Sequence, residues 1–276
     1  MVSDDGERLL QNVNQKMPIW QWYRRSKNPR KIYRDVTGNP TGMVVFSTNL
    51  VHPQALGMAV YAPNKTLFSE ILGDARQAAE RAHKIRLVIW EYPPFSAFTE
   101  WLLTQGFSVW RQTVEPVAEL STILPATISG QTATLNDVLA DARLTAQLLK
   151  QSQADYAQVH KVNPVAAMTT EQWRKIVLPD VLTTVPMVAL HDGRISAYTF
   201  PFEDEPKVLT LAWMGAQTLP ALWQLQSAQI RWAKQRGMRR LTGEFDSTDP
   251  VAWATARHWP FAPAPTYTMI GRQLSV

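Results

Sequence analysis

"LAWMGAQTLPALWQLQSAQIRWAKQRG", residues 211–237, decides the fold class of this chain. It begins as a strand and continues into a long helix, residues 222–236, with one apolar stripe at helical spacing: Leu225, Ala228, Trp232 and Ala233. A strand that turns directly into a helix is a common seat for a phosphate, because the first N–H groups of a helix lack partners. Such a turn normally carries glycine, but here it reads Gln217-Thr218-Leu219-Pro220. The stretch therefore raises the question of whether the chain binds a phosphate-bearing cofactor.

The composition is that of a globular protein that can bury a large core. The 276 residues are 45% hydrophobic and 18% charged, and the polar, acidic start is not that of a signal peptide. No apolar run approaches the ~20 residues that a membrane span needs. Because there is no cysteine, disulfides, a thiolate nucleophile and a Cys-based zinc site are excluded. We expect a cytoplasmic protein without a membrane partner.

The net charge of +5 and the pI near 9.5 permit an anionic partner. One basic run lies near the N-terminus beside Trp20, Trp22 and Tyr23, and it contains Arg24, Arg25, Lys27, Arg30, Lys31 and Arg34. This mixture occurs in single-strand binders, but we expect an amphipathic helix that covers a sheet. A second group lies on and after the long helix, where it complements the helix dipole: Arg231, Lys234, Arg236, Arg239 and Arg240. We do not expect a nucleic-acid partner.

The two halves of the chain show the same order of predicted elements. Each half reads strand, strand, helix, strand, helix, strand, and each order is preceded by helical material. In the first half these elements are residues 43–51, 55–63, 67–82, 85–92, 95–106 and a strand from 107. In the second half they are a hairpin over 185–200, then 207–216, 222–236, 239–245, 251–259 and 266–274. We therefore predict two copies of one α+β domain, residues 1–124 and 138–276, joined by a linker at 125–137.

Several features of this pattern resemble the GNAT superfamily of acyltransferases, the acetyl-CoA-dependent N-acetyltransferases, in the bacterial form with two such domains in tandem. They are the element order, the Trp213-Met214-Gly215 strand end, and the Asp-Ser-Thr-Asp entry (246–249) to the last helix. In the first half, "FTEWLLTQGFSVWRQTVEPVAEL" resembles the terminal helix, Gly-Phe corner and following strand of the other copy. The resemblance covers residues 41–272 and implies two domains, each with a mixed, mostly antiparallel sheet flanked by helices.

The resemblance also implies a cofactor site where two parallel strands splay apart. Acetyl-CoA would lie in this gap, with its pyrophosphate on the turn before the long helix. The implied contact positions are Trp213, Met214, Gly215, Gln217, Thr218, Leu219, Ala221, Leu222 and Asp249. The basic residues after the helix are the implied contacts of the nucleotide 3′-phosphate.

The turn departs from the family's Arg-Gly-x-Gly-x-Ala pattern. Gln217 stands at its arginine, and Thr218 and Pro220 stand at its glycines. Pro220 removes one N–H donor, a loss of roughly 1.5–3 kcal/mol in a charge-assisted site. We expect the N–H groups of residues 221–223 to stay available for weak anion binding. The corresponding loop of the first half, residues 64–68, also lacks the glycines.

The candidate groups for acid–base chemistry are few. Glu203 and Asp246 are candidates for a carboxylate that takes the amine proton. Asp204, Glu205 and Glu244 are further carboxylates at turns or strand ends. Tyr198 is a candidate acid, a substrate wall or a core residue, and the family's usual tyrosine position holds Ala256. The five histidines are scattered without metal-ligand spacing, so we expect no metal.

Two functions are compatible with these residues. The first is acetyl transfer from acetyl-CoA to an amine of a small acceptor, in which proximity supplies much of the rate. The alternative is a non-catalytic, degenerate GNAT fold that binds a metabolite or a protein. Eleven tryptophans predict an aromatic core or an aromatic-filled gap that blocks the pantetheine arm. The altered turn favours the alternative.

Overall fold

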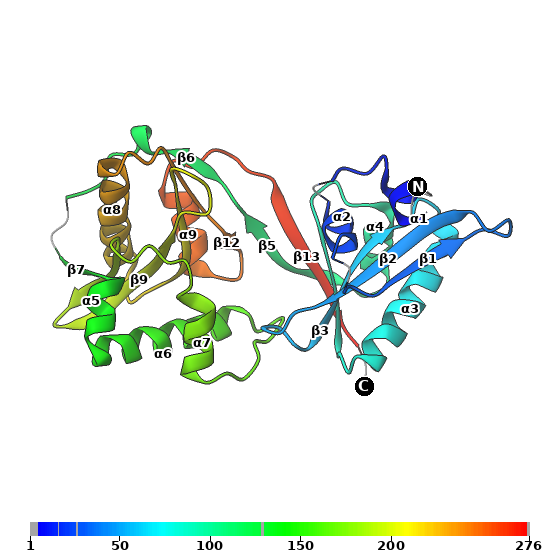
Figure 1. Cartoon of the computed structure of the whole chain (residues 1–276), viewed down its shortest axis with the longest axis horizontal. Helices are drawn as coiled ribbons and strands as arrows, with labels where there is room; N and C mark the ends of the chain where they lie inside the picture. Colours follow the sequence, from blue (N-terminus) through cyan, green and yellow to red (C-terminus); the bar gives the residue numbers. More distant parts are fainter. Residues whose placement is uncertain (1–4, 16, 26, 128–129, 275–276) are drawn as a thin grey trace. The chain divides into compact units, whose positions relative to one another are not determined.

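The computed structural model describes residues 5–15, 17–25, 27–127 and 130–274. They form two compact units, each with helices packed on a mixed sheet (Figure 1). The first unit comprises Met1–Gln112, Val162–Ala166 and Tyr267–Val276, and the second comprises Thr113–Lys161 and Ala167–Thr266. The expected α+β class is confirmed. The boundaries 1–124 and 138–276 divide the chain differently from these units and stay a prediction about its domains.

The first unit contains the following elements in chain order: α1 (Asp5–Leu10), α2 (Pro18–Tyr23), β1 (Arg30–Arg34), β2 (Pro40–Thr48), β3 (Ala55–Tyr61), the 3₁₀ turn η1 (Lys65–Leu67), α3 (Phe68–Arg81), β4 (Arg86–Glu91), α4 (Ala97–Thr104), β5 (Ser108–Val114) and β13 (Thr266–Gln273). The strand order is β1-β2-β3-β4-β13-β5. β3 and β4 are parallel and pair over Ala55–Gly57 and Arg86–Val88. α3 and α4 contribute to one core of this unit, and α1 and α2 to another. β5 continues into the second unit, where its last residues pair with β12.

The basic run near the N-terminus forms a helix only in part. α2 buries Trp20 and Tyr23, as an amphipathic helix would. Residues 30–34 instead form strand β1, because their backbone pairs with residues 40–45 of β2 and Tyr33 packs into the core. Lys31 contacts Glu70 at 3.1 Å and Asp74 at 2.7 Å. The expectation of a helix over the whole run was therefore wrong for its second part.

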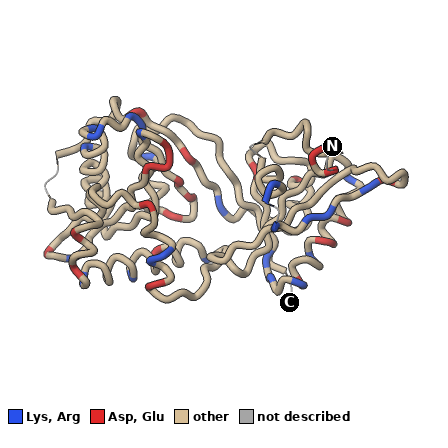
Figure 2. Tube along the Cα trace, viewed as in Figure 1, with Lys and Arg blue, Asp and Glu red and all other residues tan. Residues whose placement is uncertain are grey.

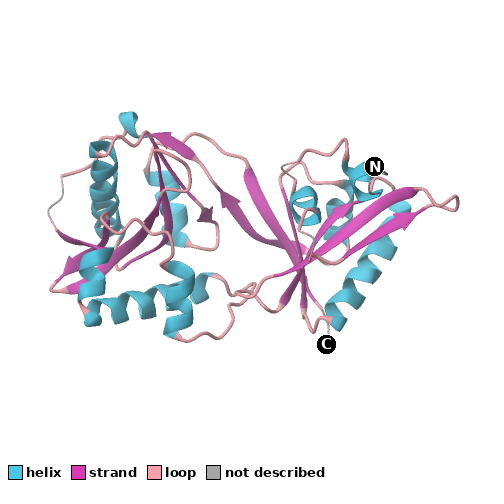
Figure 3. Cartoon of the chain, in the orientation of Figure 1, coloured by secondary structure: helices cyan, strands magenta, loops and turns pink. Residues whose placement is uncertain are grey.

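The second unit contains these elements: β6 (Val117–Glu119), the 3₁₀ turn η2 (Leu120–Thr122), β7 (Gln131–Thr134), α5 (Leu135–Ala140), α6 (Ala142–Val159), α7 (Thr170–Val177), β8 (Pro186–His191), β9 (Arg194–Phe202), β10 (Val208–Ala216), α8 (Leu219–Gln235), β11 (Arg240–Gly243), β12 (Phe245–Asp246) and α9 (Pro250–His258). The strand order is β6-β11-β10-β9-β8-β7. α8 and α9 share one apolar core with the sheet, and α5, α6 and α7 share another (Figure 3). The sheet is thus covered by helices on two sides.

The last strand lies in the sheet of the first unit, not in the second half as its sequence position suggests. β13 pairs antiparallel with the whole of β4, from Thr268 opposite Glu91 to Gln273 opposite Arg86. Met269 and Ile270 are buried in two different cores of that unit. Adjacent residues point to opposite faces of a sheet, so this strand needs a central position with both faces covered. The position between β4 and β5 supplies it.

Candidate functional site

The expected gap between two parallel strands is present in the second unit. β10 and β11 pair only over Val208–Leu211 and Arg240–Gly243, after which β10 continues beside β9 alone. The register shifts between Ala212 and Met214, and Trp213 has a left-handed φ of 33°. The bulge sends the Trp213 ring towards Phe200 and Phe202, while Met214 packs with the α8–α9 core. The strands therefore part at the place where the resemblance puts the thioester.

N–H groups of the turn that leads into α8 donate hydrogen bonds to oxygens of the protein. The Thr218 side chain is the N-cap of the helix and accepts a hydrogen bond from the Ala221 amide at 3.4 Å. The Leu222 amide donates to the Thr218 carbonyl, and the Gln217 amide donates to Ser196. Pro220 has no N–H. The expectation that the amides of residues 221–223 stay available was thus wrong for Ala221 and Leu222, because the N-cap threonine accepts from both.

Cations on α8 and just after it form hydrogen bonds or an ion pair with oxygens of the protein. The Arg231 guanidinium donates to the Ala126 carbonyl at 2.9 Å, and the Lys234 ammonium donates to the Ile123 carbonyl at 2.5 Å. Arg240 forms an ion pair with Glu205 at 3.0 Å. Figure 2 shows basic and acidic segments interspersed in both units. These three cations therefore fix neighbouring loops and are not grouped as a phosphate site.

Polar contacts cross the space between α8 and α9. Gln226, which is fully buried, donates to Thr255 at 3.3 Å and accepts a hydrogen bond from the Trp259 indole at 2.8 Å. The Thr255 hydroxyl also lies 3.2 Å from the Met214 sulfur. Where the two helices approach, the Trp223 and His258 rings stack in parallel with centroids 4.0 Å apart. These contacts occupy the space between the helices next to the strand gap.

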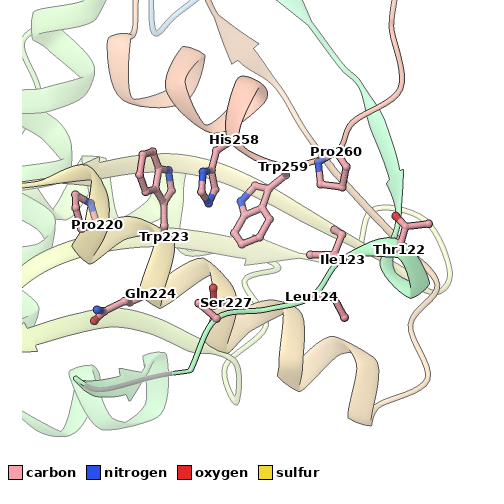
Figure 4. A pocket seen from close by; sticks show the side chains of 11 residues that line it. Thr122, Ile123, Leu124, Pro220, Trp223, Gln224, Ser227, His258, Trp259 and Pro260 are labelled. Atoms are coloured by element: carbon pink, nitrogen blue, oxygen red, sulfur yellow. The ribbon is translucent and has the colours of Figure 1, made fainter.

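A pocket of about 490 Å³ lies between α8, the end of α9 and the segment after η2 (Figure 4). Pro220, Trp223, Gln224 and Ser227 of α8 form one wall, His258, Trp259 and Pro260 form a second, and Thr122, Ile123, Leu124 and Ala126 form a third. Partial burial lowers the pKa of His258. The pocket combines aromatic walls with a few polar groups, as small-molecule sites usually do.

A polar cluster lies on the α6 side of the strand gap. The Tyr198 hydroxyl, on β9, donates to the Asp155 carboxylate at 2.8 Å. Burial is the main cause that raises the pKa of Tyr198, and the Asp155 carboxylate is the second. Gly215 lies against both, since an added Cβ would come within 2.5 Å of the Tyr198 ring and 2.6 Å of the Asp155 oxygen. Only a glycine fits at this strand position without displacing the pair.

Two further aspartates belong to this cluster. Asp249 caps α9 by accepting from the amides of Val251 and Ala252. Burial is the main cause that raises the pKa of Asp249, and the charges of Asp246 and Asp155 raise it further. Asp246 accepts a short hydrogen bond from Thr113 and lies 3.8 Å from His160. The cluster thus holds carboxylates of different environments in one place.

The structure separates the sequence-predicted site residues into two groups. Tyr198, Asp246 and Asp249 come together in the polar cluster. Glu203, Asp204 and Glu205 are exposed on the turn before β10, where Glu203 accepts a hydrogen bond from the Lys207 amide at 2.8 Å. Sequence reasoning missed Asp155 on α6, His160 at the C-cap of the same helix, and Gln226 on α8. No local pattern marks them, because single polar residues on a helix are ordinarily solvated.

Two features are absent from the residues that the structure describes. These residues contain no group of three or more His, Cys, Asp or Glu side chains placed to hold a metal ion. In the same residues, none of the helices has the length and apolar character for crossing a membrane.

Known proteins resemble this chain in structure. A GCN5-related N-acetyltransferase from Sphaerobacter thermophilus superimposes with a TM-score of 0.57 and 11% identity, over 98% of this chain and 90% of that one. A tandem GNAT protein from the clavulanic acid biosynthesis pathway gives a TM-score of 0.52 and 12% identity, over 91% and 85% of the two chains. A functionally unknown conserved protein from Staphylococcus epidermidis gives 0.52 and 10%, over 96% and 98%.

The sequence itself matches no family model and no curated protein. The structural likeness extends over nearly the whole chain and includes a tandem protein. At 10–12% identity it establishes the fold and leaves the activity open. The chain therefore has the tandem fold of the GCN5-related N-acetyltransferases, as the resemblance implied.

Proposed function

We propose that this protein is a non-catalytic GNAT fold that binds a small organic molecule in its second unit, without using acetyl-CoA. The observation that carries the proposal is the turn into α8. Pro220 lacks a donor, and Thr218 takes the Ala221 and Leu222 amides. A pyrophosphate would have to displace the helix cap, at a cost of about 1 kcal/mol, and would still find one donor missing.

The contacts between α8 and α9 support the same proposal. The pantetheine arm of CoA would have to separate Gln226 from Thr255 and Trp259, and these three side chains are buried. Separation leaves the Trp259 indole and the Gln226 amide without partners, which costs about 1–3 kcal/mol for each buried group. The pocket beside Trp223 is accessible without this disruption, so we place the ligand there.

Calorimetric titration of the purified protein with acetyl-CoA tests the proposal. We expect no saturable heat up to about 1 mM, which corresponds to a binding free energy weaker than about −4 kcal/mol. Saturation with a dissociation constant of 10–100 μM, about −5.5 to −7 kcal/mol, would overturn it, because that affinity requires a working seat.

A second candidate is acetyl transfer from acetyl-CoA to an amine of a small acceptor. The polar cluster favours it, because Asp155 and Asp246 are carboxylates near the strand gap that can take a proton from an amine. Tyr198, held by Asp155, is then the candidate acid for the leaving thiolate. Release of free CoA in the presence of small amines, abolished by Asp155→Asn, would support this candidate. No release above the Asp155→Asn level would exclude it.

A further inference from the structure

The residues that line the pocket beside Trp223 indicate a class of ligand. We infer that the pocket takes an uncharged, flat molecule that carries a hydrogen-bond acceptor, such as a ring carbonyl or ring nitrogen. This inference rests on the proposed function, since it names the class of ligand for the same site.

One face of α8 forms the main wall. Pro220, Trp223 and Ser227 follow each other at helical spacing of three and four residues, so they lie on one side of the helix. Figure 4 shows the Ser227 side chain across the pocket from His258 and Trp259. The rings of Trp223, His258 and Trp259 give the pocket flat surfaces, which favour a planar ligand.

The lining residues carry no formal charge. None of the 11 side chains that line the pocket is an Asp, Glu, Lys or Arg. The nearest cations on the same helix face, Arg231 and Lys234, donate to the carbonyls of Ala126 and Ile123. Partial burial lowers the pKa of His258, which disfavours its charged form. A charged ligand would lose its hydration without gaining a counter-charge, so the pocket favours an uncharged one.

Two polar atoms of the α8 wall lack partners among the residues that the structure describes. They are the Trp223 indole nitrogen and the Ser227 hydroxyl, and both atoms are buried. Elsewhere the chain satisfies the same two groups with each other, since the Trp173 indole donates to Ser152 at 2.9 Å. The indole nitrogen is a donor only, and the hydroxyl is able to donate. Because both atoms have almost no accessible surface, a ligand acceptor reaches either donor only after a side-chain rotation, and it then satisfies a group that is otherwise costly to bury.

Quinolin-2-one, a flat uncharged ring system with one carbonyl, is a suitable probe. Ligand-observed NMR on the full chain measures its dissociation constant, which we expect at about 1 mM, the range of a small fragment. Ser227→Ala and Trp223→Phe each remove one donor and keep the wall, so each should weaken binding about fivefold. Trp253→Phe, on α9 but outside the pocket, is the matched control and should leave binding unchanged. Quinoline-2-carboxylate, the anionic analogue, should bind at least about tenfold more weakly.

The melting temperature of each variant accompanies the binding data. Ser227→Ala removes a hydroxyl without a partner, so its melting temperature should not fall, and a loss of binding then reports recognition. Equal binding by wild type, Ser227→Ala and Trp223→Phe would overturn the inference, as would tighter binding of the carboxylate. If quinolin-2-one does not bind at 2 mM, about twice the expected dissociation constant, and acetyl-CoA gives no saturable heat, the inference is overturned but the proposed function is not. Saturable acetyl-CoA binding would overturn the proposed function itself.

Discussion

Each unit has a glycine on the strand that leads away from its parallel pairing, Gly57 of β3 at the last paired residue and Gly215 of β10 beyond it, and the two glycines lie against different neighbours. In the first unit a Cβ on Gly57 would come within 2.6 Å of the Trp22 ring and 3.1 Å of Trp90. In the second unit a Cβ on Gly215 would meet Tyr198 and the Asp155 carboxylate. The space beside the strand is thus filled with apolar rings at Gly57 and with an acid–phenol pair at Gly215. Polar groups suited to chemistry or recognition are thus kept beside the strand gap of the second unit.

The helix pairs beside the two gaps differ in the same way. In the first unit Phe68 of α3 contacts Phe98 and Trp101 of α4, with ring centroids 5.2 and 5.6 Å apart. In the second unit the polar contacts of Gln226 join α8 to α9. The preceding turns are alike, because Asn64 accepts from the Thr66 amide as Thr218 accepts from Ala221. In both turns a side-chain cap thus accepts from an N–H group at the helix start, and in the second unit polar contacts join the two helices in addition to an apolar core.

The largest effect on stability is expected from a substitution among the aromatic rings between α3 and α4. Phe98→Ala should destabilise the first unit by about 3–5 kcal/mol, because it leaves a cavity among closely packed rings. Urea unfolding, followed by hydrogen exchange to locate the loss in residues of the first unit, measures this. A loss below about 1 kcal/mol would show that the rings do not form a packed core.

A smaller effect on stability is expected from a substitution among the polar contacts between α8 and α9. Gln226→Leu keeps the volume but removes the acceptor of the Trp259 indole and the donor to Thr255, so it should cost about 1–3 kcal/mol. Gln224→Leu, two residues earlier on α8, is the control, because Gln224 makes neither bond. Equal urea midpoints for the two variants would remove the distinction between a polar and an apolar filling.

The smallest effect depends on pH. Burial and two neighbouring carboxylates raise the folded-state pKa of Asp249. Its stabilising contribution is therefore present below the unfolded pKa and is lost as the pH rises through the folded pKa. Asp249→Asn, which keeps a good N-cap, should melt a few degrees above wild type at pH 7, and the two proteins should converge below about pH 3.9, the pKa of an unfolded aspartate.

Asp141 supplies a control of opposite sign. It caps α6 by accepting from two amides, as Asp249 caps α9, but it is exposed, and the hydrogen bond from Leu144 is the main cause that lowers its pKa. Its contribution is present above the unfolded pKa and is lost as the pH falls through the folded pKa. Asp141→Asn should therefore lower the melting temperature at pH 7. The same sign for both variants would contradict the assigned burial of Asp249.

Local periodicity predicted the elements well, but not the partners they choose. The helix expected at 67–82 is found as α3, and the strand–turn–helix of 211–237 is found as β10 and α8. The sheet position of β13 was not predictable, because its apolar pattern fits any buried strand and pairing is decided by tertiary contacts. The Thr218 cap was not predicted either, since the amides of a helix start are unpaired in the sequence pattern and become paired only through side-chain geometry.

Calorimetric titration of acetyl-CoA into a Thr218→Gly, Pro220→Gly double variant, beside wild type, tests whether the turn before α8 excludes the cofactor. The substitutions remove the cap acceptor and restore a donor, so we expect a saturable isotherm for the variant and none for wild type up to about 1 mM. A variant that stays silent while it remains folded would contradict the claim that the closed turn is what excludes the cofactor. So would wild type that binds as tightly as the variant.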